Sequence, residues 1–208
     1  MLGDIVTCRL APGTQILETK AATRYDTSRT GLREAFVDLA AKGFIHLEKN
    51  KGAMLAPLDV ATVFSVFEAR IAMEKTAAAL AAVRASAEDT NALKLYRQEL
   101  QDARLSDDED GYFAIDKSVH DTIATLSRNP FITSQITTLR AHTARCWHFY
   151  KDRGLEEPVD YDGLTTIIDH VISGTPELAA EAMRKHLTTT LNAFQEMLTK
   201  QSEVLKWV

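Results

Sequence analysis

The chain has 208 residues, of which 45% are hydrophobic and 25% charged, and its net charge at pH 7 is −5. This composition is that of a soluble globular protein of one or two domains. No apolar run approaches the roughly 20 residues of a membrane span and no signal peptide is visible, so we expect no membrane partner and a cytoplasmic location. Cys8 and Cys146 are two thiols far apart, which favours free cysteines over a disulfide framework.

The first informative element is a predicted helix that starts after Ser28, a good N-cap because its hydroxyl can accept a free backbone N–H. Arg29 and Arg33 are four residues apart and share one face of this helix. A second face carries an apolar stripe at helical spacing, made of Leu32, Ala35, Phe36, Leu39 and Ala40. In helix-turn-helix proteins the first turns of such a helix enter the major groove, where arginine contacts guanine or phosphate.

Gly43 ends this helix, and a β-hairpin is predicted beyond it. Two short apolar runs, 44–47 and 53–56, flank a polar segment that contains Lys51 and Gly52. Glycine allows the backbone to come close to a phosphate. The alternative is a surface hairpin whose lysines are simply solvated.

The rest of the chain is predicted to be helical. Pro57 and Asp59 mark a boundary, because proline disfavours helix before it and aspartate can cap the next one. Apolar residues then recur every three or four positions in six segments: 60–85, 87–105, 110–126, 130–150, 161–173 and 176–198. The predicted fold class is mainly α: a winged helix-turn-helix with a small β-hairpin wing over residues 1–58, and an all-α bundle of about six helices over residues 59–208.

The charge divides in the same way. Residues 1–58 hold eight Lys or Arg and six Asp or Glu, a net of +2, so the remainder carries −7. This asymmetry is compatible with a mildly basic DNA-binding domain followed by an acidic domain. It is well below the strongly basic footprint that would by itself imply nucleic acid.

Inside the predicted bundle, Asp116 and His120 are four residues apart and lie on one helix face, and His186 lies in the last helix. An Asp and two His brought together can hold a divalent metal of the zinc, nickel or manganese type. The alternative is a hydrogen-bonded Asp–His pair at the surface.

The N-terminal segment resembles the DNA-binding domain of GntR-type bacterial repressors. The matching residues are Pro12-Gly13, Glu18, Ser28-Arg29, Arg33-Glu34-Ala35, Leu39 with Gly43, and Gly52-Ala53. The resemblance implies DNA contacts from the recognition helix and the wing tip: Thr27, Ser28, Arg29, Thr30, Arg33, Lys51 and Gly52.

Two positions depart from that pattern. Gly31 stands where the family usually has proline, which is expected to loosen the first helical turn. Only eight residues, 1–8, precede Arg9, so either the start is truncated or the first helix is short.

The predicted bundle resembles the FCD ligand-binding domain of the FadR-like branch of the same family. The matching residues are Arg70 with Glu74, Asp116 with His120, Ser127 with Asn129, Gly174 with Ala179, and Met183 with His186-Leu187. Many members of that branch hold a metal with one Asp and three His. Three of these ligands map onto Asp116, His120 and His186, whereas the fourth falls on Leu164, which cannot ligate. Water, the effector or another histidine (His142 or His148) then completes the site, or the metal has been lost.

Effectors in this branch are commonly small organic acids, sugar acids or fatty-acid derivatives. Arginine is the usual partner of a carboxylate, so the predicted effector-binding residues are Arg70 and Arg140, together with Asn129. For Arg70 a local ion pair with Glu74 is the alternative.

The sequence therefore predicts a homodimeric, non-enzymatic transcriptional regulator, a repressor, that binds a pseudo-palindromic operator and responds to a carboxylate effector. Two other functions stay open. One is a metal-dependent hydrolase that uses the Asp/His pocket. The other is an interaction module that has lost DNA binding, as Gly31 and the short first helix would allow.

Overall fold

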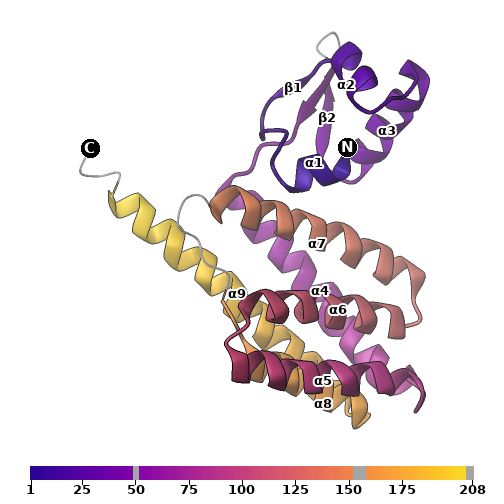
Figure 1. The fold of residues 1–208 in the computed structure, drawn as a ribbon, viewed down its shortest axis with the longest axis vertical. Coiled ribbons are helices and arrows are strands. Elements are labelled where there is room, and N and C mark those ends of the chain that lie inside the picture. The colour runs from indigo at the N-terminus through magenta and orange to yellow at the C-terminus, as the bar shows by residue number, and fades with distance from the viewer. Residues whose placement is uncertain (49–51, 152–157, 205–208) are drawn as a thin grey trace. The chain divides into compact units, whose positions relative to one another are not determined.

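The structure is a computed structural model that describes residues 1–48, 52–151 and 158–204, with side chains as far as residue 196. Figure 1 shows the course of the chain. It divides into two compact units: residues 1–63 with 141–155, and residues 64–140 with 156–208. The domain limits expected from the sequence, 1–58 and 59–208, do not anticipate that part of a late helix belongs to the first unit.

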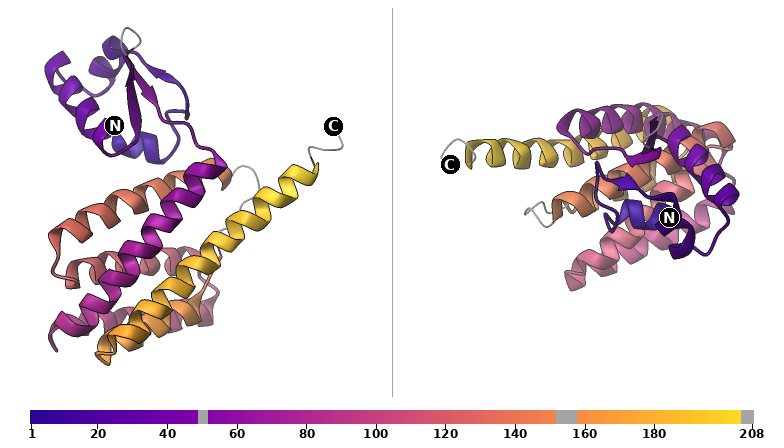
Figure 2. Two further views of the ribbon diagram at one scale, coloured as in Figure 1. Left: turned by 180° about the vertical axis from the view of Figure 1, so that it is seen from behind. Right: turned by 90° about the horizontal axis from the view of Figure 1, so that it is seen from above.

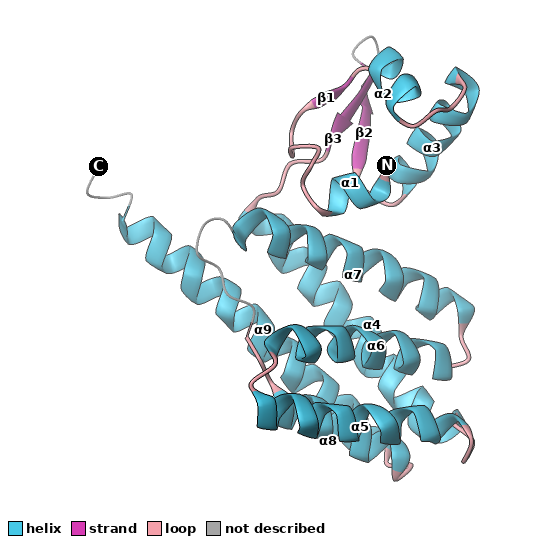
Figure 3. Ribbon diagram, viewed as in Figure 1, coloured by secondary structure: helices cyan, strands magenta, loops and turns pink. Residues whose placement is uncertain are grey.

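The first unit is a winged helix-turn-helix. Its elements are helices α1 (Leu2–Val6), α2 (Glu18–Arg24) and α3 (Arg29–Ala41), and strands β1 (Gln15–Ile16), β2 (Ile45–Glu48) and β3 (Gly52–Leu55). The strands form an antiparallel sheet in the order β1-β3-β2, with Ile45 opposite Leu55 (Figure 3). The hairpin predicted from the sequence is thus confirmed, and β1 adds a strand that was not predicted.

Local sequence explains both ends of α3. The Ser28 hydroxyl accepts the backbone N–H of Gly31 at 3.1 Å, so the predicted N-cap is confirmed. A proline at position 31 would have no N–H to give this cap. At the other end the helix stops at Ala41, and Gly43 takes a φ of +77°, the left-handed conformation typical of glycine just past a helix.

The core of the first unit is built from the apolar face of α3, the sheet and α1. Its buried residues are Ile5, Ile16, Ala21, Leu32, Phe36, Leu39, Phe44, Ile45, Ala53 and Leu55. Ala141, from helix α7 (Pro130–Lys151), packs against the same core. The first unit therefore includes a segment that lies far along the chain from the winged helix.

The second unit is a helical bundle made of most of α4 (Val60–Arg84), α5 (Asp89–Ser106), α6 (Glu109–Leu126), the first part of α7, α8 (Tyr161–Ile172) and α9 (Pro176–Val204). Two of the helices begin at side-chain caps, because Asp108 and Asp160 accept backbone N–H groups in the first turns of α6 and α8. The six predicted helices are all present, and α9 runs six residues past its predicted end.

Side chains from several of these helices share one core. α5, α6 and α8 contact one another, and α8 contacts α9. α4 runs alongside α9 (Figure 2), where the rings of Phe67 and Phe194 lie 5.6 Å apart. Within the described residues, no helix is long and apolar enough to cross a membrane.

Candidate functional site

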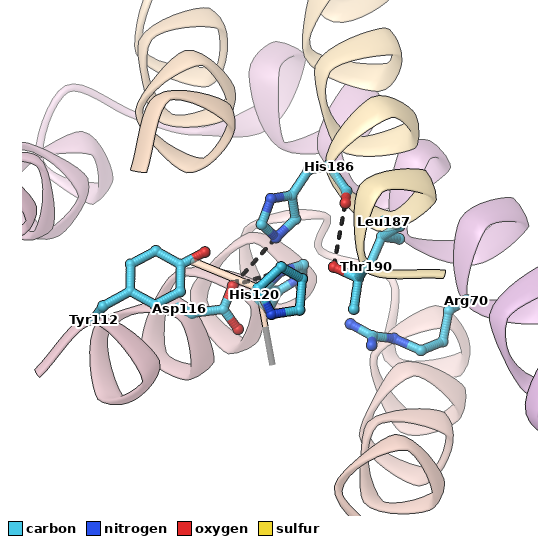
Figure 4. A pocket seen from close by; sticks show the side chains of 8 residues that line it. Arg70, Tyr112, Asp116, His120, His186, Leu187 and Thr190 are labelled. Carbon is cyan, nitrogen blue, oxygen red and sulfur yellow. Dashed lines mark hydrogen bonds and ion pairs between the residues drawn. The ribbon is translucent and has the colours of Figure 1, made fainter. Parts of the chain in front are cut away.

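Asp116, His120 and His186 come together in the second unit, as the sequence predicted. Asp116 and His120 lie one turn apart on α6, and His186 comes from α9 (Figure 4). One ligand atom from each of the three side chains lies within 4.8 Å of the other two. Both histidines are buried, so the alternative of a surface Asp–His pair does not apply.

The two imidazoles are oriented by carboxylates on their outer sides. Nε2 of His186 and Nε2 of His120 lie 3.2 and 3.4 Å from the same Asp116 Oδ1. Nδ1 of His120 meets Glu74, and Nδ1 of His186 lies 2.9 Å from Asp160. Around protein-bound metals a carboxylate on the second ring nitrogen commonly fixes the tautomer and the ring direction. Both Nε2 atoms therefore converge on one point beside Asp116.

Sequence reasoning missed the outer carboxylates. Glu74 lies 46 residues from His120, and Asp160 lies 26 residues from His186. No periodic pattern spans such separations, and Glu74 was interpreted only as the local partner of Arg70. Asp160 also precedes α8 as its N-cap, and this is the one local signal by which the sequence could have indicated it.

The carboxylates around His186 favour its protonated form in the metal-free site. Burial lowers the pKa of His186, but its bonds to Asp116 and Asp160 outweigh burial and raise the pKa to about 9. Burial raises the pKa of Asp116, but His120 and His186 hold it well below its usual value. The carboxylates thus favour a positive charge between them, and a divalent cation would supply it only by replacing the proton of His186. The two-nitrogen, one-oxygen donor set fits such a metal.

Arg70 lies in a second, fully buried ion pair. Its Nε donates to Glu74 Oε1 at 2.6 Å, and both residues are almost inaccessible. Burial would raise the pKa of Glu74, but Arg70 and His120 outweigh it and lower the pKa. The local pair considered from the sequence is therefore present, and Glu74 links Arg70 to His120.

The cluster opens into a small, mostly polar hollow. Its lining residues are Arg70, Tyr112, Asp116, His120, Pro158, His186, Leu187 and Thr190. Figure 4 shows the Arg70 guanidinium pointing from α4 toward Thr190 and His120. The hollow thus combines the three candidate metal ligands with one arginine.

Of the other two predicted effector residues, one lies beside the cluster and one does not. Arg140 Nη2 is 3.8 Å from Asp116 Oδ2, and its Nε is 3.5 Å from Asp121. Asn129 instead caps α7, where its Oδ1 accepts the N–H groups of Phe131 and Ile132. Asn129 is not among the residues that line the hollow, and its contact with an effector stays a prediction.

No further histidine completes the cluster among the described residues. Leu164 is fully buried in the apolar core of the bundle. His142 packs in the first unit, and His148 is exposed on the same helix. Leu164, onto which the resemblance maps the fourth ligand, thus lies among apolar side chains.

The predicted DNA-contacting residues lie at the start of α3 and on the wing. Thr27, Ser28, Arg29 and Thr30 are all exposed. Arg33 is also exposed, and its guanidinium pairs with Glu18 of α2 at 3.2 Å. Gly52 begins β3 with a φ of +79°, which favours glycine. Lys51 lies outside the described residues.

Comparison with known proteins identifies the family. The profile of the "Bacterial regulatory proteins, gntR family" matches residues 2–55, and that of the "FCD domain" matches residues 65–189. The chain belongs to the GntR family. It is 26% identical to the Nta operon transcriptional regulator of Aminobacter aminovorans over 95% of this chain and 96% of that one. It is 28% identical to the HTH-type transcriptional repressor RspR of Escherichia coli over 68% and 62% of the two chains.

Solved structures agree on the fold of this GntR regulator. McbR/YncC of E. coli matches with a TM-score of 0.73 at 16% identity, over 94% of this chain and 93% of that one. The chain is thus a DNA-binding transcriptional regulator with an FCD domain, and the family membership removes the enzyme alternative.

Proposed function

We propose that this GntR regulator is a homodimeric repressor whose operator affinity is controlled by a small organic acid bound at a divalent metal in the FCD domain. The observation that carries the proposal is the convergence of the His120 and His186 Nε2 atoms on Asp116 Oδ1, with a carboxylate behind each ring. Ion pairs alone do not require both rings to point at one oxygen.

Asp116, His120 and His186 would hold the metal, and Glu74 and Asp160 would keep the two imidazoles in their ligating direction. A zinc, nickel or manganese ion in such a site supplies a positive centre for carboxylate oxygens. Because Leu164 cannot ligate, three protein ligands leave coordination positions open toward the hollow.

The arginines at the hollow indicate the chemical class of the ligand. Arg70 lines the hollow and is held in place by Glu74, so its orientation is set before a ligand enters. A guanidinium recognises carboxylate by charge-assisted bonds, and Arg140 provides a second positive charge beside Asp116. These features favour a ligand with a carboxylate and a further polar oxygen.

The winged helix would bind the operator. Arg29 and Arg33 would enter the major groove, with Thr27, Ser28 and Thr30 near the phosphates and Lys51 and Gly52 at the wing. A dimer presents two such heads to a pseudo-palindrome. An effector changes operator affinity if it favours one arrangement of the heads over another.

Isothermal titration with Zn²⁺, Ni²⁺ and Mn²⁺ tests the metal site in the chelator-treated protein. We expect one site per chain that is lost in Asp116→Asn and kept in Asp169→Asn, a matched change at an exposed carboxylate paired with Arg97 on the same unit. Equal binding by the two variants would contradict the assignment. In metal-loaded protein, a panel of di- and tricarboxylic acids should then raise the melting temperature of the native chain more than that of Arg70→Gln.

A further inference from the structure

Helix α7 contributes to both units. Residues up to Arg140 belong to the second unit, and residues from Ala141 belong to the first, within one continuous helix from Pro130 to Lys151. An uninterrupted helix is stiff, because each turn is hydrogen-bonded to the next.

In the second unit α7 contacts the candidate metal site through Arg140. Its guanidinium lies near Asp116, a predicted ligand, and near Asp121 on the same helix α6. A change in the charge of Asp116 therefore changes the balance of attractions on Arg140, and hence on α7.

In the first unit α7 holds the end of the recognition helix through His142. The His142 Nε2–H donates to the carbonyl oxygen of Lys42, the C-cap residue of α3, at 2.8 Å. The imidazole also stacks on Phe44, with ring centroids 4.0 Å apart and an interplanar angle of 6°. Because a carbonyl only accepts, Nε2 must carry the hydrogen.

A second attachment lies one turn further along α7. Arg145 is 1% exposed, and its Nη2 donates to the carbonyl oxygen of Ala56, just after β3, at 2.6 Å. The Cys8 thiol donates to the Arg145 carbonyl at 3.6 Å. α7 is thus fixed to the end of α3, to the end of the wing and to the segment after α1.

We propose that His142 is a positioning residue that couples the Asp116 site to the recognition helix α3. This inference rests on the proposed effector site and names the route by which that site regulates DNA binding. Arg140 and His142 are two residues apart, about 200° around the helix, so one turn of α7 serves both contacts. Movement of Arg140 shifts His142 and, through Lys42 and Phe44, the C-terminal end of α3.

Hydrogen–deuterium exchange of the full chain tests this coupling, with peptides that cover residues 36–48 as the readout. The variants are Asp116→Asn, His142→Phe and the two combined, with Asp169→Asn as the matched control. Phenylalanine keeps a ring against Phe44 and removes the donor. His142→Gln keeps an N–H donor of similar reach and is the rescue variant.

We expect Asp116→Asn to change exchange in residues 36–48 by at least about twofold in the native and His142→Gln backgrounds, and to have no such effect in the His142→Phe background. Asp169→Asn should change nothing there. The inference is overturned if Asp116→Asn leaves this segment unchanged, or if its effect is the same with phenylalanine at position 142. The readout needs neither metal nor DNA, so failure of metal or operator binding in parallel titrations would count against the proposed function and not against this coupling.

Discussion

At the scale of single residues, Glu74 holds two buried partners with one carboxylate. Replacing it by glutamine leaves Arg70 without its counter-charge in a buried setting and leaves His120 without its anionic partner. We expect Glu74→Gln to lower the free energy of unfolding by about 3 kcal/mol, the cost typical of breaking a buried ion pair on one side. Chemical denaturation of the metal-free chain measures this.

Asp160 has a different expected role, because its side chain is 25% exposed and it contacts His186 without a buried arginine behind it. Asp160→Asn should weaken metal binding roughly 10- to 100-fold, the usual cost of losing an outer carboxylate, with a smaller loss of stability than Glu74→Gln. Metal titration and denaturation of both variants separate the two roles. A metal affinity unchanged by Asp160→Asn would contradict the orienting role.

The buried imidazole of His142 should make the stability of the first unit depend on pH. Burial lowers the pKa of His142 below its usual 6.5; the Lys42 carbonyl opposes this shift and Arg145 adds to it. The Lys42 ammonium itself pairs with Asp38. The pKa of His142 is lower in the folded state than in the unfolded state. Neutral His142 therefore makes its full contribution to the free energy of unfolding above about pH 6.5, and this contribution is lost as the pH falls through the folded pKa. Exchange protection at the end of α3 should decline from pH 7.5 to 5.5 in the native chain, and decline less in His142→Gln.

At the scale of elements, the proposed role of α3 as the recognition helix can be tested by its effect on operator affinity. Arg33→Ala should cost at least about 1 kcal/mol at the operator, because one groove or phosphate contact is removed. Lys42→Ala, at the other end of α3, is the control and should leave affinity nearly unchanged. Fluorescence anisotropy at one fixed salt concentration makes the comparison, and equal affinities would mean that the N-terminal end of α3 does not face the DNA.

The elements also show what sequence could and could not predict. Most limits of helices α4 to α9 were predicted to within two residues, because they are set by local signals such as Pro57, Asn129-Pro130 and Gly174; the end of α9, which has no such signal, was placed six residues too early. Strand β1 was missed because two residues carry no alternating pattern, and it exists only through its pairing with β3. The Asp116, His120 and His186 cluster was predicted by helix spacing and family resemblance, whereas the contacts of Glu74 and Asp160 with its histidines are tertiary and leave no pattern in the sequence.

At the scale of the whole molecule, the sharing of α7 between the units predicts that the winged helix is incomplete when alone. A fragment of residues 1–63 lacks Ala141, His142 and Arg145, and so lacks the stacking on Phe44 and the donors to Lys42 and Ala56. We expect its amides in α3 and β2 to exchange markedly faster than the same amides in the full chain. Equal protection in the two would mean that α7 adds no stability to the winged helix.

We propose that this protein recognises a specific operator through α3 and its wing. The most direct measurement is selection from a randomised duplex pool by the full chain, with Arg29→Ala/Arg33→Ala selected in parallel. The native chain should enrich one inverted repeat, and the double variant should enrich none. Enrichment of the same repeat by both proteins, or of no sequence by the folded native chain at low salt, would contradict operator recognition through α3 and the wing.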